Sequence, residues 1–440
     1  MRDLFFLGIF CILLPLALKR PFISLSLWFW SGLFVPVYWL YGIAQSISYN
    51  TVFAACTIVG YLVMKNKPQF QINSLFLSVC LFFIHTTITS FTTIALPEIV
   101  WISWENFFKV ILLFVLTCLI IREKHQFEFY IWMLLLSIGF LGFVEALKFV
   151  ASAGGHHIKG PAGHILSDNN HMALALCMTL PMIIYLISET KQRVIRLGLI
   201  AMLLLCTLAI LGTFSRGGFI GLSVVGGYFW LKSQSKLKSL LLFSIVVAIA
   251  LSILPERWFV RMNTMESVES TLEDSSFATR LNSWKIHTLM AMDRPLVGGG
   301  FKAPQFGFVW RELALDIDKL NFVETPDPGE KGWAAHSIYF QVLGDHGFVG
   351  LMLFLAIIIQ AFIRLYIIEN FYKKNNMMTC WQANLTKNLR LSLMAFCIAG
   401  AALSLAYVEI LYALVGLIFC LSVQLSLPDE SNSKQTAESP

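Results

Sequence analysis

Long apolar stretches separated by short polar connections run along most of this chain. A helix needs about 20 apolar residues to cross about 30 Å of hydrocarbon, and it satisfies its own backbone hydrogen bonds there. The pattern therefore predicts an all-α polytopic membrane protein with about twelve or thirteen transmembrane helices. The thirteen apolar centres are residues 4–18, 22–44, 52–64, 75–91, 107–121, 129–150, 171–187, 197–211, 217–231, 237–254, 347–362, 389–406 and 408–427.

The composition supports this class and excludes others. Hydrophobic residues make up 57% of the 440 residues and charged residues 13%, whereas soluble domains have about 45–50% and about 25%. A soluble globular enzyme and a nucleic-acid-binding protein are excluded. The net charge of +6 follows from the enrichment of Lys and Arg in cytoplasmic loops.

Basic residues mark every second connection between the predicted helices. Because cytoplasmic loops collect Lys and Arg, we expect this set on the cytoplasmic side, with the N-terminus outside if there are thirteen spans. The set comprises Lys19, Arg20, Lys65, Lys67, Arg122, Lys124, Lys191, Arg193, Arg196, Lys232, Lys236, Lys238, Arg364, Lys373, Lys374, Lys387 and Arg390.

One long connection, residues 255–336, holds nine Lys or Arg and twelve Asp or Glu. By parity it lies outside the cytoplasm, and its apolar spacing from Leu281 to Met290 indicates an ordered, partly helical lid. The predicted organisation is N-terminal transmembrane helices (1–254), this large outer loop (255–336), C-terminal transmembrane helices (337–427) and a disordered cytoplasmic tail (428–440).

Arg216 is the first candidate for chemistry. It lies in the tight turn Phe214-Ser215-Arg216-Gly217-Gly218, at the outer boundary of two predicted spans. Glycines let a ligand approach the backbone closely. Taken alone, this position is better explained by an arginine that snorkels to the interface.

Arg280 is the second candidate. It opens the predicted helix of the outer loop, which is followed by a bend from Pro295 to Gly300. A guanidinium donates two parallel hydrogen bonds to phosphate oxygens and stays charged, so it suits a diphosphate. The alternative is a solvated arginine of a surface loop.

His336 is the third candidate, because it lies where the polar loop returns to the membrane. A neutral imidazole accepts a proton from an attacking hydroxyl near pH 7, although a capping or interfacial histidine is the plainer alternative. Asp345, further along the same segment, is an ionisable residue at the edge of a span, and such residues tend to be functional.

The loop before the span at 171–187 carries Asp168 and Asn170. Asp168 is expected to cap that helix, and Glu145 and Lys148 are expected to pair along the preceding helix. The nearby histidines at 156, 157, 164 and 171 match no tight ligand spacing, so no metal site is predicted.

Together these motifs resemble the O-antigen ligase and polymerase superfamily of bacterial envelope glycosyltransferases. The resemblance covers most of the chain. It rests on the Ser215–Gly218 turn, Arg280-x-x-x-Trp284 with the Pro295–Gly300 stretch, the His336–Gly347 segment and the Asp168–Asn170 loop. The opening residues 1–22 look most like the O-glycosylation ligases associated with exosortase systems. Ser337 and Asp345 depart from the family pattern, in which Asn and Glu are common.

The resemblance implies transfer of a glycan from undecaprenyl diphosphate to an acceptor hydroxyl of a lipid, protein or glycan, on the periplasmic face of the bacterial inner membrane. It gives diphosphate binding to Arg216 and Arg280, catalysis to His336, and positioning of substrate to Asp168, Asn170 and Asp345. The residues 255–336 would form the large periplasmic loop. The resemblance implies no metal, no cofactor and no nucleic-acid partner; membrane lipid surrounds the site.

Other functions remain open at this point. A polymerase of the same superfamily would share the donor and the fold. A transporter of lipid-linked sugars would show internal repeats and ionisable residues near the membrane midplane, whereas the distinctive polar groups here cluster on one side. A purely structural assembly partner would not explain why three candidate residues face one compartment.

Overall fold

The computed structural model describes residues 2–232, 235–237, 275–320 and 323–426, and the regular elements in these ranges are all helical. The first part contains α1 (Arg2–Lys19), α2 (Pro21–Phe34), η1 (Pro36–Tyr38), η2 (Gly42–Ser46), α3 (Tyr49–Val63), α4 (Ser74–Phe91), α5 (Pro97–Ile120), α6 (Lys124–Leu134), η3 (Leu135–Gly139), α7 (Phe140–Ala151), α8 (Asn169–Glu189), α9 (Arg193–Gly212) and α10 (Arg216–Lys232). The second contains α14 (Ser275–Asp293), η4 (Ala303–Gln305), α15 (Gly307–Ala314), η5 (Ile317–Leu320), α16 (Ile338–Lys374), α17 (Trp381–Gly400) and α18 (Glu409–Ser426).

The predicted class, an all-α polytopic membrane protein, is confirmed. Six described helices are long and apolar enough to cross a membrane: α4, α5, the continuous segment Lys124–Ala151, α8, α9 and α16. Three shorter apolar helices accompany them, at Pro21–Phe34, Tyr49–Val63 and Glu409–Leu425. A total of about twelve or thirteen spans stays a prediction.

Two predicted spans have the wrong bounds. The span predicted at 22–44 ends at Phe34, because Val35 takes a left-handed conformation (φ 49°) and Pro36, which lacks an N–H, starts a short 3-10 turn. The span predicted at 389–406 is α17, which begins at Trp381 and ends at Gly400. The span predicted at 237–254 lies outside the described residues apart from Leu237.

The helix after the polar loop also begins earlier than predicted. The sequence predicts a span centred on 347–362, but α16 starts at Ile338 and continues through a break at Gly347, where φ is 70° and ψ is −171°. Pro295 and Gly298 pack so closely there that a Cβ at Gly347 would lie 2.6 Å from the Pro295 carbonyl oxygen. Asp345 therefore lies inside a helix, two residues before its break, and not at its edge.

The basic connections gather at one end of the bundle. Lys124 Nζ lies 2.6 Å from a Glu189 carboxylate oxygen, and the Asn384 side-chain amide donates to Glu189 over 2.9 Å. Arg122 reaches the carbonyl of Gln69 over 3.2 Å. Connections from four parts of the chain thus share one end, as the alternation of charge predicts.

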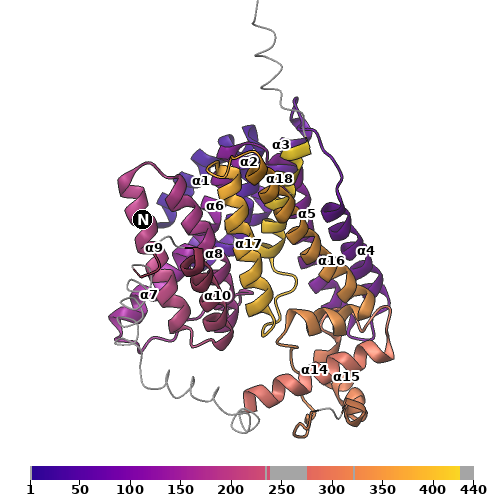
Figure 1. Cartoon of the computed structure of the whole chain (residues 1–440). Helices are drawn as coiled ribbons and strands as arrows, with labels where there is room; N and C mark the ends of the chain where they lie inside the picture. Colours follow the sequence, from indigo (N-terminus) through magenta and orange to yellow (C-terminus); the bar gives the residue numbers. More distant parts are fainter. Residues whose placement is uncertain (1, 233–234, 238–274, 321–322, 427–440) are drawn as a thin grey trace, which may run out of the picture.

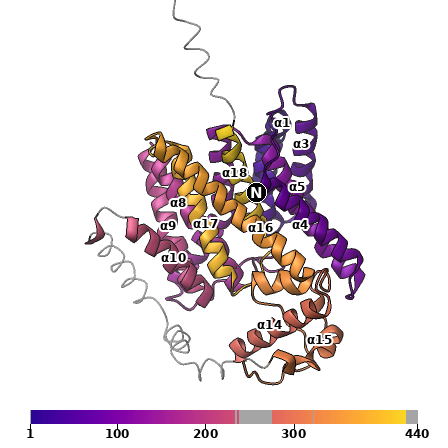
Figure 2. The same ribbon diagram turned by 45° about the vertical axis from the view of Figure 1, so that its right-hand side comes forward.

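The polar loop lies at the opposite end. Figures 1 and 2 show α14 and α15 packed beyond the ends of the long helices. The turn between α17 and α18 lies at this same end of the bundle. The core of the bundle is formed by α8, α17 and α18, whose residues are mostly buried. We call the end that carries α14 the outer end.

Thiol labelling tests this orientation. In a cysteine-free background, we expect Asp327→Cys, on the polar loop, to react with a membrane-impermeant maleimide in intact spheroplasts. Lys191→Cys, in a basic connection, should react only after the membrane is opened. The reverse pattern of labelling would contradict an outward-facing loop.

Candidate functional site

The start of α8 is fixed by Asp168. Its carboxylate accepts hydrogen bonds from the backbone N–H groups of Asn170 (2.8 Å) and His171 (3.3 Å), so the predicted N-cap is confirmed. Burial raises the pKa of this carboxyl, but the charge of His171 and the two N–H donors lower it more, and the net pKa lies below the ordinary value. Asp168 is therefore an anion at the outer end of α8.

Arg216 opens α10 directly after a sharp turn. Phe214 in this turn has a φ of 56°, and the Asn169 side chain donates to the Thr213 carbonyl over 2.7 Å. The turn therefore lies against the start of α8. Gly218 packs so tightly there that a Cβ would lie 2.6 Å from that of Ala173.

His336 is held in an unusual backbone conformation just before α16. Its φ is 47°, a left-handed value that costs free energy in a residue other than glycine, and its N–H donates to the Ser404 hydroxyl over 2.8 Å. Ser404 lies in the turn between α17 and α18. Such strain persists only where surrounding contacts impose it, and it is concentrated at functional sites.

The charges of three other residues act on the His336 imidazole. Burial lowers the pKa of His336, the Arg280 guanidinium lowers it further, Asp168 raises it and His171 lowers it again, with a net decrease. Arg280 and Asp168 belong to α14 and to the loop before α8, so segments far apart in the sequence meet around His336. The low pKa keeps the imidazole neutral at neutral pH.

Trp284 holds α14 in this place. It lies one helical turn after Arg280, and its indole N–H donates to the carbonyl of Ala335, the residue before His336, over 2.8 Å. Its ring also stacks on Phe340 of α16, with ring centres 5.1 Å apart. The two contacts bring the face of α14 that carries Arg280 toward His336.

The Arg216 turn contacts the same surroundings from another side. A Cβ at Gly217 would lie 3.6 Å from that of Ala402, two residues before Ser404. The turn therefore adjoins both the Asp168 loop, through Asn169, and the α17–α18 turn that binds the His336 backbone. The predicted residues Arg216, Arg280, His336 and Asp168 belong to one group of adjoining segments at the outer end.

Asn170 and Asp345 have different surroundings. Asn170 is half-buried in the first turn of α8, beside Asp168. Asp345 is fully buried, and its carboxylate accepts hydrogen bonds from the Lys302 N–H (2.9 Å) and the Tyr407 hydroxyl (3.0 Å). These partners give Asp345 a role in fastening the polar loop to α16, and direct contact with substrate stays a prediction.

Sequence reasoning missed two contributors to this site. The sequence marks His171 only as one of four histidines without ligand spacing, and Ser404 belongs to no motif. His171 is visible in sequence only as the residue after the Asp168–Asn170 loop. Ser404 contributes because the fold brings the α17–α18 turn within hydrogen-bonding distance of the His336 N–H.

Comparison with sequence families gives two adjacent matches. Residues 200–355 match a family described as O-Antigen ligase, and residues 1–191 match a family of unknown function, DUF5935. No curated protein matches the chain. Fold and site thus define a multi-pass, all-helical membrane protein, and the first match supports a member of the O-antigen ligase superfamily, whose donors are lipid-linked glycans. The subtype associated with exosortase systems is not among these matches and stays a prediction.

The two matched regions meet at the candidate site. Arg216, Arg280 and His336 lie within 200–355, whereas Asp168 and Asn170 lie within 1–191. The charge of Asp168 acts on His336 across this division.

Substitution of Trp284 tests how α14 is held. Trp284→Ala removes both the ring stacking and the hydrogen bond, so we expect faster cleavage of the polar loop in limited proteolysis, while Trp284→Phe, which keeps the stacking, should have an intermediate effect. Trp333→Ala is the control, since Trp333 lies in the same loop and is 39% exposed. Equal cleavage of all three variants and the unaltered protein would argue against this contact.

Proposed function

We propose that this protein transfers a glycan from undecaprenyl diphosphate to an acceptor hydroxyl on the periplasmic face of the bacterial inner membrane. The match of residues 200–355 to the O-antigen ligase family supports the reaction class. The observation that carries the residue assignment is the meeting of Arg280 and Asp168 around the strained His336 at the end of the bundle opposite the basic connections.

The location suits a donor with a lipid tail. The polyprenyl chain stays among the membrane helices, while the diphosphate and the sugar lie at the interface. The proposed groups lie in turns and helix starts at the outer end: Arg216 begins α10, Asp168 precedes α8, and His336 precedes α16. In this proposal, these turns and helix starts meet the diphosphate at the membrane interface, where a lipid-linked donor presents its reacting bond.

His336 is proposed as the general base. Its neutral imidazole accepts the proton of the acceptor hydroxyl, while the hydroxyl oxygen forms a bond to the anomeric carbon of the donor sugar. The bond between that carbon and the diphosphate oxygen breaks, and the electron pair leaves with undecaprenyl diphosphate. The products are the glycosylated acceptor and the lipid diphosphate.

Arg216 and Arg280 are proposed to bind the diphosphate. Their planar guanidinium groups donate paired hydrogen bonds to phosphate oxygens and stabilise the negative charge that grows on the leaving group. Arg280 has a second effect, since its positive charge also keeps the nearby imidazole neutral. Asp168 acts in the opposite direction and stabilises the imidazolium once the proton has been transferred. Asn170 is proposed to position the sugar.

Single substitutions test the residue assignment. We expect His336→Asn to lower glycan transfer by about 100-fold to 10,000-fold, and Arg216→Gln or Arg280→Gln to lower it by about 100-fold to 1,000-fold. Asparagine is chosen because it tolerates a positive φ better than most residues do. Transfer is measured in membranes from a deletion strain carrying each variant at matched protein level.

Arg311→Gln is the matched control, because Arg311 lies in the same polar loop with a side chain that is 58% exposed. It should keep full activity. Full activity in the three site variants would reject the assignment. Accumulation of free polymer on the lipid carrier, with no transferred product, would instead indicate a polymerase.

The dependence of transfer on pH tests the charges around His336. The folded-state pKa of His336 lies below its ordinary value, so the active neutral form should persist on acidification until the pH falls through that lowered pKa. Arg280→Gln removes a charge that lowers the pKa, so the acidic limb of the residual activity should move to higher pH. Asp168→Asn removes a charge that raises the pKa, so the limb should move to lower pH.

Asn is itself a good helix cap, so Asp168→Asn retains the start of α8. Arg311→Gln should leave the profile unchanged. Shifts of both site variants in the same direction would contradict the proposed electrostatic roles.

A further inference from the structure

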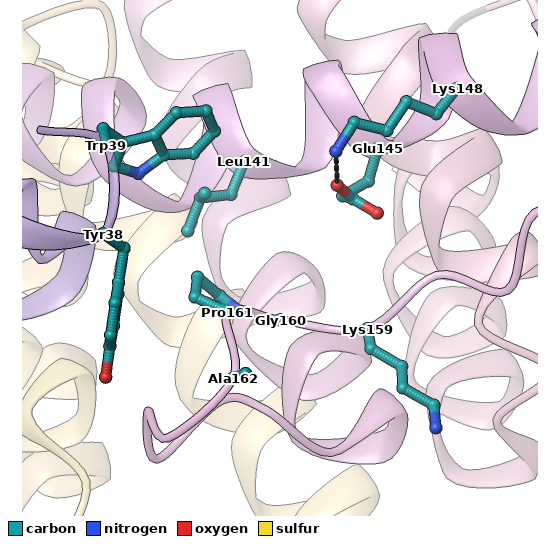
Figure 3. A pocket seen from close by; sticks show the side chains of 9 residues that line it. All are labelled: Tyr38, Trp39, Leu141, Glu145, Lys148, Lys159, Gly160, Pro161 and Ala162. Carbon is teal, nitrogen blue, oxygen red and sulfur yellow. Dashed lines mark hydrogen bonds and ion pairs between the residues drawn. The ribbon is translucent and has the colours of Figure 1, made fainter. Parts of the chain in front are cut away.

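A pocket of about 360 Å³ lies at the outer end, between α7, the turn after α2 and the loop that leads to α8 (Figure 3). Its lining includes Tyr38 and Trp39 on one side, Glu145 and Lys148 of α7 on another, and Lys159 and Pro161 of the loop. Its volume is in the range of small-molecule sites. All of its lining residues belong to the region that matches the family of unknown function.

One wall of the pocket is aromatic and fixed in position. Trp39 stacks on Phe34 with ring centres 5.4 Å apart, and it contacts the edge of Phe140 at 6.3 Å. The indole nitrogen of Trp39 is buried and has no hydrogen-bond partner among the described residues. The stacking on Phe34 and the edge contact with Phe140 therefore fix the ring that forms this wall.

The opposite side of the pocket is charged. Glu145 exposes only 15% of its side chain, and its two carboxylate oxygens lie 2.6 Å from Lys148 Nζ and 2.6 Å from His156 Nε2. Lys159 forms no ion pair within the described part of the chain. With two lysines and one glutamate, the lining has an excess of positive charge beside a carboxylate that is held in place.

The loop that carries Lys159 also contacts the candidate site. The ring of His157 stacks on Phe214, in the turn before Arg216, with centres 5.6 Å apart. Lys159 follows His157 by two residues, so at most about 7 Å of chain separates their Cα atoms. At its other end the same loop reaches Asp168, the cap of α8.

We propose that this pocket binds one anionic sugar residue, of the hexuronate class, in the glycan that the protein transfers. This inference rests on the proposed function. The aromatic wall packs against the apolar face of a sugar ring, Glu145 accepts hydrogen bonds from its hydroxyls, and Lys159 pairs with its carboxylate. A carboxylate in the lining favours a ligand with O–H donors over a bare phosphate group, which offers only acceptors.

Direct binding to the purified full-length protein in detergent tests the proposal. The probe is a uronic-acid disaccharide, compared with a neutral disaccharide of the same linkage by isothermal titration calorimetry. We expect tighter binding of the uronic-acid probe, and Lys159→Gln should weaken it about tenfold without changing the neutral probe. Trp39→Ala should weaken both, and Trp39→Phe, which keeps a ring on Phe34, is the variant to use if the alanine variant does not fold.

Lys319→Gln is the control, since Lys319 is an exposed lysine on the same outer side and pairs with Asp316. Equal affinity for the two probes, or uronate binding unaffected by both pocket substitutions, would overturn the proposal. A second outcome would also overturn it. In this outcome the disaccharide does not bind, but the protein binds phosphatidylglycerol nanodiscs more tightly than neutral-lipid nanodiscs, and this preference depends on Lys159.

The same variants separate this inference from the proposed function. His336→Asn should lose transfer and still bind the uronic-acid probe. If His336→Asn keeps full transfer, the proposed function fails whatever the pocket binds. If it loses transfer but no probe binds the pocket of the unaltered protein, only the pocket assignment fails.

Discussion

The attachment of the polar loop to the break in α16 is the constraint on which the candidate site depends. The N–H groups of Gly299 and Gly300 donate to the carbonyls of Gly344 and Asp345 over 3.0 and 2.8 Å, and the Asp345 side chain binds the Lys302 N–H. Glycine is required on both sides, because Gly298 and Gly347 have positive φ and their backbones touch. This junction fixes the C-terminal end of α14, while Trp284 fixes its middle, and together they determine where Arg280 lies.

Burial gives the site its electrostatic properties. A half-buried imidazole between a guanidinium and a carboxylate feels each charge more strongly than it would in water. The charges of Arg280 and His171 lower the pKa of His336 and the charge of Asp168 raises it, so the imidazole remains neutral but keeps a counter-charge for its protonated form. The strained backbone of His336 is the cost of this placement, and the hydrogen bond from its N–H to Ser404 helps to offset it.

The outer end combines two regions with different family matches. The N-terminal region supplies Asp168, His171 and the aromatic pocket, and the following region supplies Arg216, Arg280 and His336. The loop from His157 to Asp168 connects them, since it contacts the Arg216 turn through His157 and caps α8 through Asp168. If one region holds a recognition pocket and the other a reaction site, this would explain why the two regions form one continuous helical bundle.

The sequence alone determined the helical membrane class, the sharing of one end by the basic connections, the cap at Asp168, the pair between Glu145 and Lys148 and the presence of a helix in the outer loop. The prediction that Arg280 opens this helix is wrong, because α14 begins at Ser275 and Arg280 lies in its second turn. These features depend on apolar length, charge and contacts between near neighbours, which are legible in a linear pattern. It could not determine the end of α2 at Phe34, the early start of α16 or the burial of Asp345, because long-range packing decides where a helix may stop or break. Only the tertiary structure brought Ser404 to the His336 backbone and Asp168 near its imidazole, since contacts between residues far apart in the chain leave no periodic signal.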